Sequence, residues 1–337
     1  MYDVGIIGLG QIAYSIDKDP NRKIIWSHIK AYESFSNIKI KAICDVNINL
    51  VKNIKKECNI EKGYTDYNLM LKENKFDIVS ICTPISTHLD IIRICIKNKV
   101  KAIFCEKTIS YSSKEAKVVL DMCKEDNIIF AVNYILRWDN INKTIKTLLE
   151  NNVIGKIYTI VGYGATALYT STSHLIDLML YFSNSNPTWV VGEKQKDFIR
   201  IVHGEKDCGG IGMIGFKSGI IGFVKGVSES PNKYMLEIDI IGEHGRIRLY
   251  DNGTKYDIYQ YKKNKNNAGK EYEQLKLVKS EAPYPNERMI NAIQNIIDCL
   301  ENKNDKLLSS GETAIDSIKI IEAIKESSDM KKIIFIN

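Results

Sequence analysis

The chain has 337 residues, 26% of them charged and 44% hydrophobic, which is the composition of an ordinary globular protein long enough for two domains. Its apolar runs are shorter than a membrane span, and no basic-then-apolar leader precedes the first of them. We therefore expect no membrane partner and a cytoplasmic location. The net charge of +6 comes from lysines scattered along the chain, so we expect no nucleic-acid partner.

The eight cysteines contain no C-x-x-C pair, and several lie inside apolar runs, as Cys82 does after Ile78–Ile81. This pattern favours reduced thiols, buried as small hydrophobic residues, over a disulfide framework. A metal or redox role is the less favoured alternative, and we expect no metal site.

A glycine-rich turn near the start is the strongest local signal. The apolar run Val4–Ile7 predicts a buried parallel strand, and Gly8–Ala13 after it fits the G-x-G-x-x-G/A turn of a dinucleotide-binding βαβ unit. In such a turn Gly8 permits the bend, and Gly10 lets backbone N–H groups approach a pyrophosphate. Similar turns occur in ordinary loops, so the motif gains its weight from a position between a strand and a helix.

Residues 14–26 interrupt the expected βαβ pattern. Pro20 cannot continue a helix, and Ser27 is suited to cap a new one over about residues 28–35. The intervening loop would lie beside the phosphate turn, where it could cover a cofactor or substrate or be a neutral surface insertion. His28 is most simply interpreted as a capping or packing residue.

The second strand, over residues 38–45, ends in Asp45. A carboxylate at this position can accept hydrogen bonds from ribose hydroxyls and repels a 2′-phosphate, and no Arg or Ser follows it directly. The cofactor is therefore expected to be NAD, with NADP the less favoured choice. The alternative is an acid that acts as an N-cap or meets only solvent.

The alternation of helix and strand continues through the first part. It predicts helices over about 48–58, 67–73 and 89–98, the last capped by Ser86 or Thr87, and strands over 62–64, 77–82 and 102–105. The last two strands lead directly into Thr83, Pro84, His88, Glu106 and Lys107. These residues are expected at the carboxyl edge of a doubly wound sheet, where ligands bind, although His88 could equally pack.

Strand-like runs dominate the second part. They cover residues 157–162, 189–193, 211–216, 220–226, 235–241, 246–249 and 257–261, with turns at 217–219, 242–245 and 251–253 that predict antiparallel hairpins. Helices are expected over about 286–301 and 312–328, the second with Ser309 and Glu312 at capping-box spacing, before a strand at 332–336. We predict an α/β chain with a doubly wound Rossmann domain over 1–130 and an α+β domain with a large, mostly antiparallel open sheet over 131–337.

His174 and Asp177 are three residues apart in a helix expected over 173–181, so both lie on one face. Two polar groups on an otherwise apolar helix call for a reason. They could be a base and its carboxylate partner facing a nicotinamide across the domain cleft. They could equally be a histidine at a helix start paired locally with an acid.

The ordered set of motifs resembles the Gfo/Idh/MocA oxidoreductases over essentially the whole chain. The matching residues are Gly8–Ala13, Asp45, Thr83, Pro84, His88, Glu106, Lys107, Asn133, Arg137, Gly155–Ile157 and Ser173–Asp177. The resemblance implies a Rossmann domain that binds the cofactor through Gly8, Gly10, Gln11, Ile12, Asp45, Thr83, Pro84, His88, Glu106 and Lys107. It also implies a second domain whose open sheet carries the substrate and often an oligomer interface, hence a homodimer or homotetramer.

Two positions depart from the family pattern. The family's Glu-Lys-Pro is replaced by Glu106-Lys107-Thr108, which keeps the lysine and loses the proline. Members similar to inositol dehydrogenases carry an Asp four residues before the histidine, where this chain has Thr170. Members that act on nucleotide sugars commonly lack that Asp as well, so the departure argues against a close inositol dehydrogenase and not against catalysis.

The resemblance thus implies hydride transfer between NAD and a secondary alcohol or ketone of a sugar, cyclitol or nucleotide sugar. Lys107 and His174 are the expected catalytic residues. Arg137, Thr170 and Asp177 are the expected substrate contacts, and a structural tie between the domains is an alternative role for Arg137. The competing hypothesis is a non-catalytic NAD-binding sensor on the same scaffold.

Overall fold

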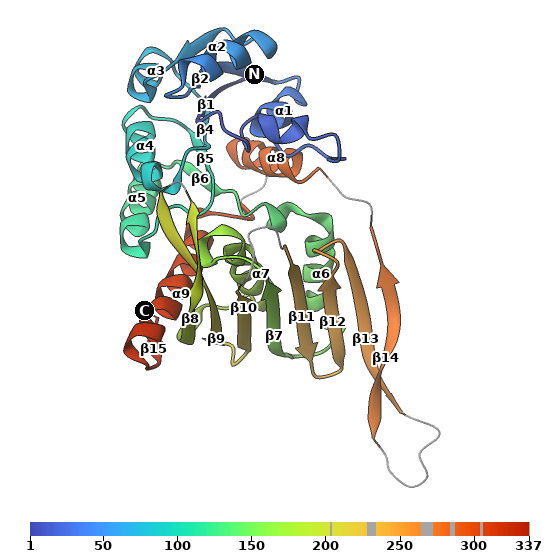
Figure 1. Cartoon of the computed structure of the whole chain (residues 1–337). Coiled ribbons are helices and arrows are strands. Elements are labelled where there is room, and N and C mark those ends of the chain that lie inside the picture. Colours follow the sequence, from blue (N-terminus) through green and yellow to red (C-terminus); the bar gives the residue numbers. More distant parts are fainter. Residues whose placement is uncertain (203, 228–233, 264–271, 284–286, 304–305, 337) are drawn as a thin grey trace. The chain divides into compact units, whose positions relative to one another are not determined.

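The computed structural model describes every residue except 203, 228–233, 264–271, 284–286, 304–305 and 337. The chain forms two compact units, the first from Met1–Asp139 with Asn286–Ile315 and the second from Asn140–Pro285 with Asp316–Asn337. The elements of each unit are labelled in Figure 1. The chain therefore leaves the first unit at Asp139 and returns to it for the helix near residue 290.

The first unit is built on a six-stranded sheet in the order β3-β2-β1-β4-β5-β6. Its strands are β1 Tyr2–Ile7, β2 Ile38–Cys44, β3 Lys62–Tyr64, β4 Ile78–Ile81, β5 Ala102–Cys105 and β6 Ile129–Val132. All five pairings are parallel, and every residue of β4 and β5 is buried. This confirms the predicted doubly wound sheet, whose strand order reverses between β1 and β4.

The helices of the first unit are α1 His28–Glu33, α2 Ile48–Glu57, α3 Tyr67–Glu73, α4 Ile85–Lys97, α5 Ser113–Glu125 and α8 Arg288–Leu300, with short 3-10 turns η1 Ser15–Lys18 and η2 Ile135–Trp138. The Ser27 side chain caps α1 as predicted, by accepting a hydrogen bond from the Lys30 N–H. The predicted first residue of the late helix, Asn286, lies outside the described residues.

The predicted start of α4 is wrong. The helix begins at Ile85 with Pro84 as its N-cap, four residues before the expected position, and neither Ser86 nor Thr87 caps it. The fixed φ of proline suits the entry to a helix, because the missing N–H would have had no helical partner there. Thr87 lies inside the first turn, where its hydroxyl donates to the Pro84 carbonyl at 2.8 Å.

The second unit is built on a nine-stranded sheet in the order β14-β13-β12-β11-β7-β10-β9-β8-β15. Its strands are β7 Ile157–Gly164, β8 Pro187–Val202, β9 Glu205–Phe216, β10 Ile221–Gly226, β11 Leu236–Gly242, β12 Gly245–Tyr250, β13 Lys255–Lys263, β14 Glu273–Glu281 and β15 Ile334–Phe335. Only the pairing of β7 with β10 is parallel among those described, which confirms a mostly antiparallel sheet. The sequence reading missed β14.

Helices lie close against one face of this sheet because glycines line that face. The helices are α6 Asn140–Glu150, α7 Ser173–Ser183 and α9 Gly311–Met330, the last starting within the first unit. A Cβ at Gly222 would lie 2.7 Å from the Met179 methyl of α7, and one at Gly212 would lie 2.9 Å from Ile324 of α9. The opposite face of the same strands carries exposed side chains.

The predicted capping box of α9 is also wrong, by one residue. The Thr313 N–H donates to the Ser310 hydroxyl at 3.4 Å, so Ser310 and not Ser309 caps the helix. Ser309 is fully buried and its hydroxyl donates to the Val132 carbonyl at the end of β6. No helix within the described residues is long and apolar enough to cross a membrane.

Candidate functional site

The glycine turn of the first unit has the backbone that its motif requires. Gly8 has a φ of +88°, and a Cβ added to it would lie 2.7 Å from the carbonyl carbon of Cys82. A Cβ added to Gly10 would meet nothing within 4 Å. Gly8 therefore holds the turn against β4, and Gly10 leaves open space over the backbone for a ligand to approach.

No regular helix follows this turn, unlike in the simplest form of the motif. The chain passes through turns into the short η1, and α1 begins only at His28. Within the part of the chain that the structure describes, the N–H groups of Gln11 and Ile12 donate to no other protein group. These N–H groups are suited to meet a pyrophosphate from the turn itself.

The segment of residues 14–26 is tied to its own unit at several points. The Asp17 carboxylate accepts hydrogen bonds from the N–H groups of Trp26 and Ser27, both at 2.9 Å. The Trp26 ring lies beside the Arg288 guanidinium, at 5.1 Å from its centroid, at the start of α8. The segment therefore has a fixed path, and a lid movement would have to break these contacts.

Asp45 lies between the end of β2 and the glycine turn. One carboxylate oxygen accepts the Leu9 N–H at 2.7 Å and the other accepts the Asn47 N–H at 2.8 Å. The N-cap of α2 is Asn47, whose side chain accepts from Asn49 and Leu50, so capping is not the role of Asp45. The half-buried carboxylate is held beside the turn, where a ribose would follow a pyrophosphate.

The ends of β4 and β5 bring together the other expected cofactor residues. His88 is fully buried, and its two ring nitrogens lie 3.0 Å from the Thr108 carbonyl oxygen and 2.8 Å from that of Thr83. Burial lowers the pKa of His88, and the contacts with the two carbonyls act in the opposite direction. The ring lies between the two loops and contacts both. It supports the loops that carry Thr83 and Lys107, as the packing interpretation expects.

Glu106 and Lys107 follow β5 directly, and both are half-buried. The Glu106 carboxylate accepts a hydrogen bond from the Asn133 amide at 2.6 Å and lies 3.1 Å from Nε2 of His28. Burial acts to raise the pKa of Glu106, but the hydrogen bonds and the charges of His28 and Lys107 outweigh it, and the pKa lies below its ordinary value. The peptide bond from Lys107 to Thr108 is cis.

The remaining expected residue of the first unit is Arg137, in η2. It is buried, with 5% of its surface exposed, and its guanidinium donates to the Leu308 carbonyl at 3.1 Å. This contact lies within the first unit. Part of the donor capacity of Arg137 is therefore used to hold the segment before α9.

The second unit contains His174, Asp177 and Thr170. His174 is half-buried at the start of α7, and Asp177, one turn later, is 1% exposed. One turn of π-helix, Leu168–Thr172, leads into α7, and Thr170 lies within it. Both the N–H and the hydroxyl of Thr170 donate to one carboxylate oxygen of Asp207, at 2.9 and 2.7 Å.

Asp207 is a residue that sequence reasoning missed. It lies on β9, is 4% exposed, and also accepts the Tyr169 N–H at 3.1 Å. Three hydrogen bonds to one turn identify it as the residue that fixes the Thr170 loop. It could not be found from spacing, since it lies 37 residues from Thr170 and belongs to no local motif.

Comparison with known proteins agrees with this arrangement. A family model described as "Oxidoreductase family, NAD-binding Rossmann fold" matches residues 2–134, and its companion, "Oxidoreductase family, C-terminal alpha/beta domain", matches residues 162–334. The chain is 23% identical to the myo-inositol 2-dehydrogenase of Thermotoga maritima over 267 residues, which cover 72% of this chain and 74% of that relative. It is 26% identical to the scyllo-inositol 2-dehydrogenase (NAD⁺) of Bacillus subtilis over 259 residues, 72% of each chain.

A solved structure shares the complete fold. The WlbA dehydrogenase of Bordetella pertussis, determined in complex with NADH and UDP-GlcNAcA, aligns with a TM-score of 0.79 over 100% of this chain and 99% of that one, at 17% identity.

These observations define a two-part oxidoreductase with an NAD-binding Rossmann fold. The chain belongs to the Gfo/Idh/MocA family and is an NAD-dependent enzyme, as the sequence predicted. The site fits the cofactor, because Gly8 takes a conformation that suits glycine, the surface over Gly10 is open, and the Asp45 carboxylate is held beside the glycine turn by the Leu9 N–H. The residues that would hold NAD are those of the glycine turn, Asp45 and the ends of β4 and β5.

Proposed function

We propose that this enzyme transfers a hydride between NAD and a secondary alcohol or ketone of a sugar, cyclitol or nucleotide sugar. The observation that carries the proposal is the place of Lys107, directly after β5 and in the same unit as the glycine turn and Asp45. The names of the relatives, two inositol dehydrogenases and an enzyme bound to a nucleotide sugar, support the substrate class. No feature of the described residues favours the non-catalytic alternative.

The protein must orient the reactants and move one proton, while bound NAD supplies the hydride acceptor or donor. We assign proton transfer to His174, which takes the hydroxyl proton in the oxidative direction. Lys107 stabilises the negative charge that develops on the substrate oxygen. Gly8, Gly10 and Asp45 hold the pyrophosphate and ribose in place.

Arg137, Thr170 and Asp177 are the proposed substrate contacts. The Thr170 hydroxyl proton is committed to Asp207, so the oxygen of Thr170 offers only its lone pairs to a ligand. Thr170 would therefore accept a hydrogen bond from a substrate hydroxyl, a role that suits a polyol.

The test is a screen of the purified chain for NAD reduction, followed by absorbance at 340 nm, against cyclitols, free sugars and nucleotide sugars. We expect turnover with at least one class. Reduction of NAD by none of them, and oxidation of NADH by none of the matching ketones, would contradict the proposal.

The role of Asp45 gives a prediction about cofactor choice. Asp45→Ala removes the acceptor for the ribose hydroxyls and the charge that repels a 2′-phosphate, so the preference for NADH over NADPH is expected to fall by about tenfold or more. Fluorescence titrations with the two reduced cofactors measure the ratio. Asp77→Ala, which removes a half-exposed acid bonded to the Asp3 N–H at the opposite end of β1, is the control. An unchanged ratio in Asp45→Ala would remove Asp45 from the cofactor site.

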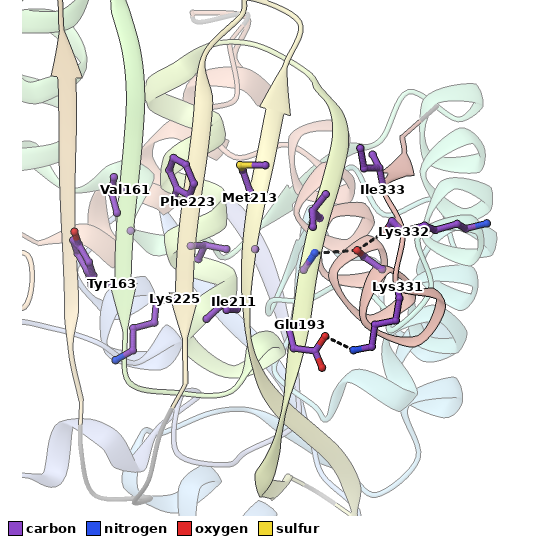
Figure 2. Close-up of a pocket in the computed structure, with 16 residues that line it drawn as sticks. Val161, Tyr163, Glu193, Ile211, Met213, Phe223, Lys225, Lys331, Lys332 and Ile333 are labelled. Atoms are coloured by element: carbon purple, nitrogen blue, oxygen red, sulfur yellow. Dashed lines mark hydrogen bonds and ion pairs between the residues drawn. The ribbon is translucent and has the colours of Figure 1, made fainter.

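We further propose a homodimer or homotetramer formed through the open face of the nine-stranded sheet. Phe223 on β10 lies opposite Val161 on β7 and Met213 on β9 in the register, and Figure 2 shows these three side chains on neighbouring strands. They line a hollow of about 740 Å³, and Ile211 and Phe223 are 48% and 41% exposed. Exposed apolar side chains gathered on one sheet face are typical of an interface.

Phe223→Asp is expected to weaken self-association by about thirtyfold or more, because it places a charge among apolar side chains. Sedimentation velocity over a range of concentrations measures the change. Tyr158→Asp is the matched control, since Tyr158 is 48% exposed on neighbouring β7 but points to the other face. A wild-type monomer, or equal effects of the two variants, would refute this interface.

We also propose a cytoplasmic location. The eight cysteines are free thiols, and burial raises the pKa of Cys44 to about 12 and that of Cys58 to about 11, so these thiols are unreactive.

A further inference from the structure

A continuous series of buried hydrogen bonds runs from α1 to the residue before Lys107. The Tyr32 hydroxyl lies 2.8 Å from the Ser80 hydroxyl, which lies 3.0 Å from Nδ1 of His28. Nε2 of the same ring lies 3.1 Å from the Glu106 carboxylate. Tyr32, Ser80 and His28 are completely buried, so no water competes for these contacts.

The protons of this series can be placed in one consistent direction. Glu106 is ionised, since its pKa lies below the ordinary value, so Nε2–H of His28 donates to it. With Nε2–H donating to Glu106, Nδ1 can accept from the Ser80 hydroxyl, whose oxygen can accept from the Tyr32 hydroxyl. Burial raises the pKa of Tyr32, so this first donor keeps its proton. Both ring nitrogens of His28 and the hydroxyls of Ser80 and Tyr32 thus have partners within the series.

The composition is that of a Ser-His-Glu hydrolase triad, but the geometry excludes that use. Ser80 lies inside β4, where all four residues are buried, and its oxygen is occupied by Tyr32. No substrate can reach it. The series therefore holds the carboxylate at one end and activates no nucleophile at the other.

The place of His28 depends on the segment that precedes it. The Asp17 carboxylate bonds the Ser27 N–H, and the His28 N–H donates to the Ile12 carbonyl at 3.1 Å. The segment of residues 14–26 thus places the His28 imidazole near the carboxyl edge of the sheet, beside Glu106. The segment that interrupts the βαβ pattern therefore has a structural role of its own, different from that of a lid or of a neutral surface insertion.

We propose that His28 is a positioning residue for Lys107. By holding the ionised Glu106 carboxylate at the end of β5, His28 fixes the backbone from which Lys107 projects and partly offsets the negative charge beside it. The inference rests on the proposed catalytic role of Lys107. Its structural part, the dependence of the Lys107 environment on His28, can be measured without any substrate.

The test compares His28→Gln with His28→Asn. The Gln amide nitrogen can take the place of Nε2 and keep the bond to Glu106, whereas the Asn amide reaches only the place of Nδ1 and the Ser80 hydroxyl. A residue that only fills space would give two similar variants. We expect His28→Asn to lower kcat by about tenfold to a hundredfold with an unchanged Kd for NADH, and His28→Gln to restore most of the rate.

The second readout is acetylation of Lys107 by acetic anhydride, followed by mass spectrometry across a range of pH. Loss of the His28 donor leaves a stronger negative field at Lys107, so its amine holds its proton more tightly. Labelling at pH 8 should become about threefold slower in His28→Asn and stay unchanged in His28→Gln. Asn133→Ala, which removes the other donor to Glu106 and leaves His28 in place, should slow labelling in the same way.

The outcomes separate the two proposals. If labelling of Lys107 changes in His28→Asn and Asn133→Ala but the wild-type chain turns over no substrate, the positioning contact is supported and the proposed function is rejected. Equal labelling and equal kcat in His28→Asn and His28→Gln would overturn the inference. If neither His28 variant folds, unchanged labelling of Lys107 in Asn133→Ala would by itself overturn the inference.

Discussion

Lys107→Met is expected to lower kcat by about a hundredfold to ten-thousandfold, with less than about a threefold change in the Kd for NADH. Methionine keeps most of the length of the side chain and removes the amine that stabilises charge on the substrate oxygen. The turn that holds the cofactor is unaltered, because Gly8 and Asp45 make their contacts through β1, β2 and β4. Steady-state rates on the best substrate of the screen and fluorescence titration with NADH measure the two quantities.

His174→Ala should give a loss of similar size, and the double variant should lose little more than either single one, since residues that act in one step are not additive. The matched control is His244→Ala, which changes an exposed histidine of the same unit. A rate in Lys107→Met within about threefold of wild type would remove Lys107 from the mechanism.

Gly8→Ala is expected to lower the free energy of unfolding by about 2–4 kcal/mol and to abolish NADH binding. The new methyl group would lie 2.7 Å from the backbone of Cys82, which cannot move without displacing β4, and the residue would keep a φ of +88°. Urea denaturation followed by circular dichroism measures the change in stability.

Gly10→Ala separates folding from binding. Because its methyl group meets nothing within 4 Å, stability should change by less than about 1 kcal/mol. The methyl would occupy the space that a pyrophosphate approaches, so NADH affinity should fall by about tenfold or more. Normal NADH binding in Gly10→Ala would mean that the cofactor does not lie over this turn.

The fold was predictable wherever a signal is local. Apolar runs ending in Gly8, Asp45 and Glu106 define three parallel strands of the first sheet, and turns near 217–219 and 242–245 define hairpins of the second sheet. Helix starts were less certain, because several residues near a helix can serve as the cap. Residues 83–88 contain Ser and Thr side chains that could cap a helix, yet the N-cap of α4 is Pro84.

Much of the site could not be predicted, because its contacts join residues distant in sequence. The His28–Glu106 contact spans 78 residues, and the Asp207–Thr170 contact spans 37. Periodicity and spacing describe neighbours along one element and carry no information about such pairs. The edge strand β14 was missed for a related reason, since almost all of it is exposed and its polar and apolar residues do not alternate regularly.

The central claim is that this enzyme moves a hydride between NAD and a carbinol carbon with the help of Lys107. The most direct measurement uses the best substrate of the screen with deuterium at that carbon, followed by mass spectrometry of the reduced cofactor. The account predicts deuterium on the nicotinamide ring with the wild-type chain and almost none with Lys107→Met over the same time. Tight binding of NADH with no transfer of deuterium by the wild type would contradict it.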